Sequence, residues 1–127
     1  MEVYFADSPM KKFIELVMFD LDGTLADTGH DLADSVNFTR GHFNLPPLTE
    51  PVVYSNVGRG VEHLLKRSLP EECEAHFLQV MAVFLERYEN HLLDRTVLYP
   101  GVSQVLSYFG AKRRAVVRNK LHRLTVA

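Results

Sequence analysis

The feature that most constrains this chain is an apolar segment that ends at two aspartates and a glycine. Residues 13–19 are apolar at every position except Glu15, and residues 20–23 (DLDG) follow directly. An apolar run of this length is typical of a strand buried on both faces of a parallel sheet. In open sheets of this kind, ligands bind at the carboxyl ends of the strands. We therefore expect Asp20 and Asp22 to lie at the rim of a binding site.

The spacing of the two aspartates suits joint chemistry. Side chains alternate along an extended chain, so Asp20 and Asp22 are expected to point to the same side. Two such carboxylates can bind Mg²⁺ through oxygen, and they can divide the roles of nucleophile and general acid. Gly23 allows a sharp turn, and Thr24 offers a hydroxyl that can stabilise it. The segment thus predicts a small acidic site.

Two other interpretations of this segment fit less well. An Asp-Gly turn in a β-hairpin needs a second strand, whereas residues 26–40 have the pattern of a helix. A calcium loop of the EF-hand type needs glycine at its sixth position and glutamate at its twelfth, where this chain has Leu25 and Asp31. A loop that carries an aspartyl nucleophile is therefore favoured.

Composition excludes several classes of protein. The chain has 127 residues, of which 46% are hydrophobic, and a formal net charge of −2, as in one globular domain. Because it has no apolar run near the ~20 residues of a membrane span, and residues 1–12 lack a signal-peptide pattern, we expect a cytoplasmic protein without membrane contact. The near-neutral charge argues against nucleic-acid binding. We expect the one basic cluster, at residues 112–114, to be solvated rather than to bind nucleic acid. The single cysteine, Cys73, can form no internal disulfide.

The pattern between residues 27 and 94 is helical, without a strand. We expect four helices here: one that is capped by Asp27 or Thr28 and runs to about residue 42, a short one from about 49, one from about 61 to 70, and one from about 71 to 93. Residues 102–109 then predict a short helix, and residues 115–117 a second buried strand. The expected organisation is a polar leader (1–12), a core in two parts (13–26 and 95–127) and an inserted helical unit (27–94).

The motif at residues 19–25 (FDLDGTL) resembles the first motif of the haloacid dehalogenase superfamily of phosphatases. The order of strand, helical insert, helix and strand is similar to members with a cap after this motif. Further matches resemble the phosphoglycolate phosphatase branch: Asp31-Leu32 after the first motif, VGRG at 57–60 and YPGV at 99–102. Relatives that act on β-phosphoglucose or pyrophosphate share most of them. The resemblance implies an α/β fold, with an incomplete Rossmann-like parallel-sheet core and an inserted α-helical cap.

The resemblance also implies a function. It implies a Mg²⁺-dependent phosphatase that hydrolyses a small phosphorylated metabolite, similar to 2-phosphoglycolate, through an aspartyl-phosphate intermediate. Asp20 would be the nucleophile and Asp22 the general acid and base, and both would contribute to the metal site. Thr24, Arg59 and Asn119 would bind the substrate.

Two departures from the family pattern leave a second function open. The superfamily has a serine or threonine at the end of its second strand, where this chain has Arg118 before Asn119 and Lys120. The lysine and the acidic pair that the family carries in later segments have no counterpart after Lys120. The chain resembles the first part of a phosphatase, and the alternative is an impaired remnant that serves only as a binding or structural module. Two strands with uncovered faces also predict self-association.

Overall fold

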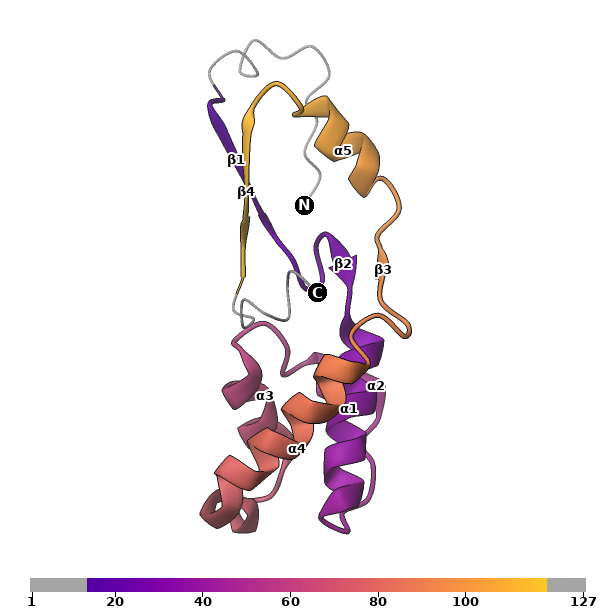
Figure 1. The fold of residues 1–127 in the computed structure, drawn as a ribbon, viewed down its shortest axis with the longest axis vertical. Coiled ribbons are helices and arrows are strands. Elements are labelled where there is room, and N and C mark those ends of the chain that lie inside the picture. Colours follow the sequence, from indigo (N-terminus) through magenta and orange to yellow (C-terminus); the bar gives the residue numbers. More distant parts are fainter. Residues whose placement is uncertain (1–13, 119–127) are drawn as a thin grey trace.

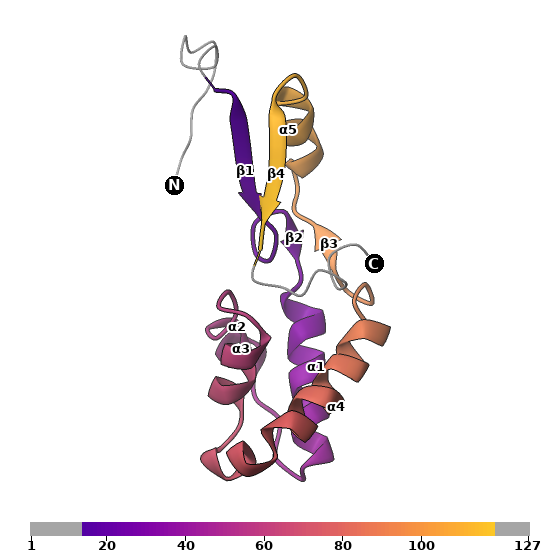
Figure 2. The same ribbon diagram turned by 60° about the vertical axis from the view of Figure 1, so that its left-hand side comes forward.

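A computed structural model of the chain describes residues 14–118. The strands β1 and β4 and helix α5 lie at one end of an elongated molecule, helices α1 to α4 lie at the other, and β2 and β3 lie between (Figures 1 and 2). The elements in chain order are β1 (Leu16–Asp20), β2 (Ala26–Asp27), α1 (Gly29–His42), α2 (Glu50–Tyr54), α3 (Val61–Ser68), the 3₁₀ helix η2 (Glu71–His76), α4 (Phe77–Asn90), β3 (Val97–Leu98), α5 (Val102–Tyr108) and β4 (Arg113–Val117).

The two longer strands form the parallel pair that the sequence predicts. Leu16 lies opposite Arg113 and Asp20 lies opposite Val117, so the carboxyl ends of both strands face the helices (Figure 1). β1 is shorter than its apolar run, since residues 14 and 15 precede it as irregular chain. The pairing brings the residues that follow β1 and β4 to the same edge of the sheet.

One face of this sheet is exposed in the described part of the chain. Leu16, Met18 and Val117 share that face and are 49%, 65% and 56% exposed. The opposite face is only partly covered: the Arg114 guanidinium donates a hydrogen bond to the Leu106 carbonyl of α5 at 3.0 Å, but Val116 is 48% exposed there. An exposed apolar face agrees with the expectation of an incomplete core. Self-association through it stays a prediction.

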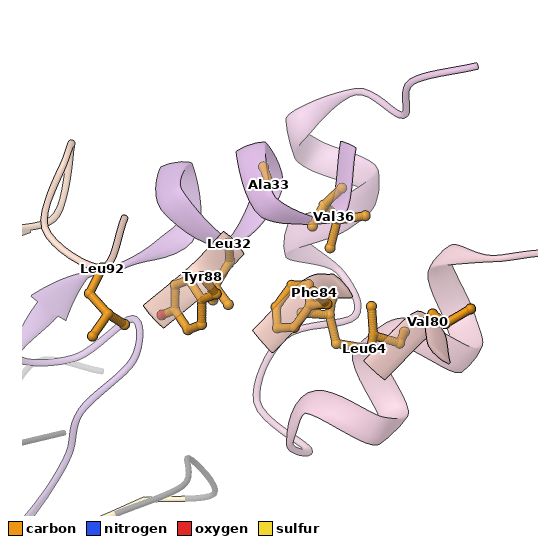
Figure 3. Close-up of a cluster of buried hydrophobic side chains, with 10 residues drawn as sticks. Leu32, Ala33, Val36, Leu64, Val80, Phe84, Tyr88 and Leu92 are labelled. Atoms are coloured by element: carbon orange, nitrogen blue, oxygen red, sulfur yellow. The ribbon is translucent and has the colours of Figure 1, made fainter. Parts of the chain in front are cut away.

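The helices have their own apolar core. Val80, Phe84 and Tyr88 recur every four residues on α4 and are fully buried, because positions four apart share one helix face. Each large side chain buried in this way contributes about 1.5–3 kcal/mol to stability. Figure 3 shows how these side chains meet those of α1 and α3. The cluster consists of Leu32, Ala33, Val36, Val53, Leu64, Leu65, Val80, Phe84, Tyr88 and Leu92.

One expected helix boundary was wrong. The helix expected from about residue 71 is a 3₁₀ turn up to His76, and α4 begins only at Phe77. None of residues 71–76 is fully buried, and only Cys73 among them packs against the helical core, so little packing favours a regular α-helix there. Helix α1 begins at Gly29 with Thr28, one of the two expected cap residues, at its N-terminal cap position. The Thr28 hydroxyl bonds to Asp22, however, and caps no backbone group of α1. No helix in the described residues is long and apolar enough to cross a membrane.

A polar cluster joins α2 to the start of α1 and to the segment after α4. The Glu50 carboxylate accepts hydrogen bonds from the Tyr54 hydroxyl and from Arg95, each at 2.9 Å, and lies 3.1 Å from His30 Nδ1. Hydrogen bonds from His30, Arg95 and Tyr54 lower the pKa of Glu50 to about 2. The same neighbourhood raises the pKa of Tyr54 to about 12, chiefly through burial and its bond to Glu50.

This lowered pKa predicts a pH-dependent contribution to stability. Because the folded state favours ionised Glu50, its contribution is complete above the ordinary pKa of 4.5 and is lost as the pH falls towards about 2. Urea unfolding should therefore show Glu50→Gln to be less stable than the unchanged chain near neutral pH, with the gap closing in acid. Glu62→Gln is the comparison: the exposed Lys66 partner also lowers the pKa of Glu62, so we expect a gap that closes in the same direction but is much smaller. A gap of constant size across the acid range would contradict this prediction.

Candidate active site

The turn after β1 is held by backbone hydrogen bonds. The Leu21 carbonyl accepts the N–H groups of Thr24, Leu25 and Ala26 at 3.2, 3.0 and 3.1 Å. Gly23 has a φ of +77°, a left-handed conformation that strains residues with a side chain. The sharp turn expected at Gly23 is therefore present, and it fixes the backbone that carries the two aspartates.

The two aspartates lie where the sequence places them. Asp20 is the last residue of β1, and its Oδ1 accepts the Leu21 N–H at 2.8 Å. Asp22 is half-buried, and its Oδ1 accepts the Thr28 hydroxyl at 2.7 Å. This second bond ties the acidic turn to the start of α1. Both side chains line one pocket.

That pocket lies between the end of β1 and the helices. Its helical side consists of Leu32 from α1, Val61 and Leu64 from α3, Tyr88 from α4, and the loop before α3 at positions 57, 58 and 60. The acidic groups thus occupy one side of the pocket, and mainly apolar side chains occupy the other. A small polar group bound to the carboxylates would be sheltered from water on its far side, which strengthens electrostatic contacts.

Tyr88 is a site residue that sequence reasoning missed. Its four-residue spacing with Phe84 indicated only a core position, and it is indeed fully buried. Yet it also lines the pocket with Asp20 and Asp22. Burial, and then the charges of Asp22 and Asp31, raise the pKa of its phenol well above the ordinary value. The available signal was a hydroxyl in a helical stripe otherwise made of phenylalanine and aliphatic residues.

Of the other predicted site residues that the structure describes, neither Arg59 nor Thr24 lines the pocket. Arg59 is exposed and lines a separate depression with Glu62, His63, Lys66 and Arg67, although Gly58 and Gly60 on either side of it line the pocket. Thr24 is exposed in the turn. Asn119 lies outside the described residues. The roles expected for these three residues in substrate binding stay predictions.

Arg118 directly follows β4, whose last residue lies opposite Asp20. The position at which the family pattern has a hydroxyl side chain is therefore beside the acidic turn. Arg118 is half-buried there. An arginine brings a permanent positive charge and a bulkier side chain to a position expected to hold a small donor.

The acidic turn offers the ligands that Mg²⁺ prefers. Within residues 14–118 there is no group of three or more His, Cys, Asp or Glu side chains that could hold a metal ion. Asp20 and Asp22 supply two carboxylates to one pocket. Mg²⁺ commonly binds through one or two carboxylates and completes its shell with water and substrate phosphate. The two carboxylates fit this mode of Mg²⁺ binding. They do not fit a metal ion whose ligands must all come from the protein.

A buried carboxylate holds together the two segments that join the helices to the sheet. Asp31, only 2% exposed, accepts the N–H groups of Arg95 and Thr96 at 2.9 and 2.8 Å and the Thr96 hydroxyl at 2.7 Å. Nearby, β2 pairs with β3 in antiparallel fashion, and the Tyr99 N–H bonds to the Leu25 carbonyl at 3.1 Å. These contacts fix the helices next to the acidic turn.

Comparison with known proteins places these features in a family. The family described as haloacid dehalogenase-like hydrolase matches residues 17–123. The phosphoglycolate phosphatase of Chromobacterium violaceum is 39% identical over 122 residues, which cover 91% of this chain and 55% of the relative. That of Nitrosospira multiformis is 35% identical over 120 residues, with 89% and 53% covered. The chain thus spans about half the length of the curated relatives it matches.

Solved structures agree with this assignment. A predicted phosphoglycolate phosphatase from Haemophilus somnus superimposes with a TM-score of 0.77 at 31% identity, over 88% of this chain and 56% of that one. A haloacid dehalogenase-like hydrolase from Bacteroides fragilis gives 0.78 at 14% identity, over 87% and 54%, and so supports the fold alone. The expected α/β fold, an incomplete parallel-sheet core with an inserted helical cap, is confirmed. The chain belongs to the haloacid dehalogenase-like hydrolase family.

Proposed function

We propose that this chain hydrolyses a small phosphate monoester, similar to 2-phosphoglycolate, in a Mg²⁺-dependent reaction at the acidic turn. The observation that carries the proposal is the pair Asp20 and Asp22, which line one pocket at the carboxyl end of β1. Membership of a hydrolase family supports it, and so do relatives named phosphoglycolate phosphatase that match most of this chain.

In the proposed reaction the two carboxylates have different roles. Ionised Asp20 attacks phosphorus, and the bond from phosphorus to the leaving oxygen breaks as Asp22 donates a proton to that oxygen. Asp22, now ionised, takes a proton from the water that hydrolyses the aspartyl phosphate, which regenerates Asp20 and releases phosphate. The Thr28 hydroxyl, at 2.7 Å from Asp22, fixes the orientation of the acid.

The proposed cofactor is Mg²⁺, held by the Asp20 carboxylate and the Asp22 backbone carbonyl. When bound, it would neutralise the repulsion between an anionic nucleophile and an anionic phosphate. The position of Asp20 at the end of β1 and the backbone of the acidic turn are set by the hydrogen bonds to the Leu21 carbonyl. The protein therefore presents these oxygens in one fixed arrangement.

The role of Asp22 predicts a specific kinetic effect. Asp22→Asn should lower kcat by about 10²–10⁴-fold with little change in KM, because an amide cannot donate or accept the proton. Steady-state phosphate release from 2-phosphoglycolate measures both constants. Asp34→Asn removes an exposed carboxylate that pairs with Arg95, and it should change neither constant. A loss confined to KM would refute the acid–base role.

A second candidate function is binding without turnover. Arg118 favours it, because this residue follows β4 at the sheet edge that carries Asp20. Phosphate release measured with and without Mg²⁺ separates the two candidates. Release that requires Mg²⁺ supports the phosphatase. Binding of 2-phosphoglycolate without release supports the non-catalytic module.

A further inference from the structure

We infer that Gly29 and Tyr54 position the loop of residues 57–60, which forms part of the pocket wall, and thereby set the affinity for the leaving group of the substrate. The inference rests on the proposed function only for the identity of the ligand. Neither residue belongs to the described lining of the pocket. Both are therefore positioning residues, which act through the loop.

The loop continues directly from α2. Tyr54 is the last residue of α2, and its carbonyl accepts the Val57 N–H at 3.1 Å. The pocket lining includes Val57, Gly58 and Gly60. At the other end of the loop, the Gly60 carbonyl accepts the Leu64 N–H of α3 at 3.1 Å. Because the loop is short and bonded to a helix at each end, the position of α2 fixes this part of the wall.

A close contact between Tyr54 and Gly29 sets where α2 lies. A Cβ atom on Gly29 would come within 2.8 Å of Tyr54 Cε1 and 3.1 Å of Tyr54 Cζ. These distances are shorter than the ~3.5–4.0 Å that unbonded carbon atoms prefer. Gly29 is the first residue of α1, so its lack of a side chain lets the Tyr54 ring lie directly on this helix.

The Tyr54 ring is held at its hydroxyl as well. The hydroxyl donates a hydrogen bond to Glu50 Oε2 at 2.9 Å and lies 2.9 Å from His30 Nδ1. Glu50 is on α2 and His30 is on α1, so the hydroxyl joins the two helices. A ring that is held in this way cannot turn aside freely. A displacement caused at Gly29 would therefore pass to α2 and from there to the loop.

The residue before Gly29 holds the other side of the pocket. Thr28 is only 3% exposed, and its hydroxyl bonds to Asp22 at 2.7 Å. Two consecutive residues thus contact the acidic turn and the helix that leads into the loop. A change at Tyr54 should alter the loop and leave Asp22 in place. The expected effect is on substrate binding rather than on the chemical step.

The test compares variants that displace or release the Tyr54 ring with a matched control. Gly29→Ala displaces the ring, and Tyr54→Phe removes only its hydroxyl. Gly41→Ala is the control, because Gly41 is on the same helix and a Cβ there would meet no described atom within 4 Å beyond that helix. A double variant adds Gly29→Ala to Tyr54→Ala, in which the ring is missing. Circular dichroism would confirm that each variant is folded.

Two measurements are made on each variant. Calorimetry in Mg²⁺ gives the affinity for 3-phosphonopropionate, in which a methylene replaces the ester oxygen of 2-phosphoglycolate and prevents hydrolysis. Phosphate release from 2-phosphoglycolate gives kcat and KM.

Gly29→Ala and Tyr54→Phe should each weaken binding of 3-phosphonopropionate about 5-fold or more, and Gly41→Ala should change it less than about 2-fold. KM should rise in parallel with the loss of affinity, while kcat stays within about 2-fold of the unchanged chain. Gly29→Ala should cause no further loss in Tyr54→Ala, because the ring that it displaces is gone.

Several results would overturn the inference. They are unchanged affinity in Gly29→Ala or Tyr54→Phe, an equal loss in Gly41→Ala, additive losses in the double variant, a lower kcat at constant KM, or no binding to the unchanged chain. The proposed function is tested separately. The expected affinities without phosphate release would support the roles of Gly29 and Tyr54 and remove the turnover. Phosphate release with one KM in all variants would support the turnover and remove these roles.

Discussion

Asp20→Asn is expected to reduce phosphate release from 2-phosphoglycolate by about 10⁴-fold or more, because an amide is a poor nucleophile and a weaker metal ligand than a carboxylate. The effect should exceed that of Asp22→Asn, since loss of the nucleophile removes the covalent route. Phosphate release in Mg²⁺, measured at saturating substrate, gives the comparison.

The control for this change is Glu15→Gln, which removes one negative charge just before β1. Its side chain is exposed at the end of the strand opposite to the acidic turn, so we expect rates close to those of the unchanged chain. If Asp20→Asn retained a tenth or more of the activity (about 1.4 kcal/mol of barrier or less), Asp20 would not be the nucleophile.

Asp31→Ala is expected to have the largest effect on stability among the carboxylates of the helices. It removes the acceptor of two backbone N–H groups and one hydroxyl, from Arg95 and Thr96. Buried donors left without an acceptor cost about 1–3 kcal/mol each before relaxation or water entry. We therefore expect the free energy of unfolding to fall by about 3 kcal/mol, as measured by urea denaturation.

Asp34→Ala provides the comparison for Asp31. Asp34 lies one turn later on α1 and pairs with the Arg95 side chain at 3.0 Å, but it is exposed. Surface pairs of this kind contribute about 0–1 kcal/mol. Similar small losses for both variants would show that the bonds of Asp31 to the segment after α4 add little to stability.

The parts of the structure that the sequence predicted are those that depend on local sequence patterns. The apolar run before Asp20, the turn at Gly23 and the four-residue stripe of α4 are each formed by residues that are close together in the sequence. The structure contains all three. The position of Asp20 and Asp22 at a strand end follows from the same local pattern. It needs no knowledge of distant contacts.

The parts that sequence did not predict depend on distant partners. Strands β2 and β3 have two residues each and exist only because Ala26 meets Leu98. The donors that bond to Asp31 lie 64 and 65 positions along the chain. Nothing near Asp31 in the sequence indicates them. The prediction that Tyr88 lies in the core was correct. Its position in the pocket lining, however, depends on how the helices pack against the acidic turn.

The most direct test of the proposed chemistry is to trap the phosphorylated protein. The chain would be mixed with 2-phosphoglycolate and Mg²⁺, quenched in acid, digested and examined by mass spectrometry. The account predicts a phosphoryl group on the peptide that contains Asp20, which hydroxylamine removes and which is missing without Mg²⁺ and in Asp20→Asn. Phosphate release without any phosphoryl group on that peptide, or a phosphoryl group that persists in Asp20→Asn, would contradict the account.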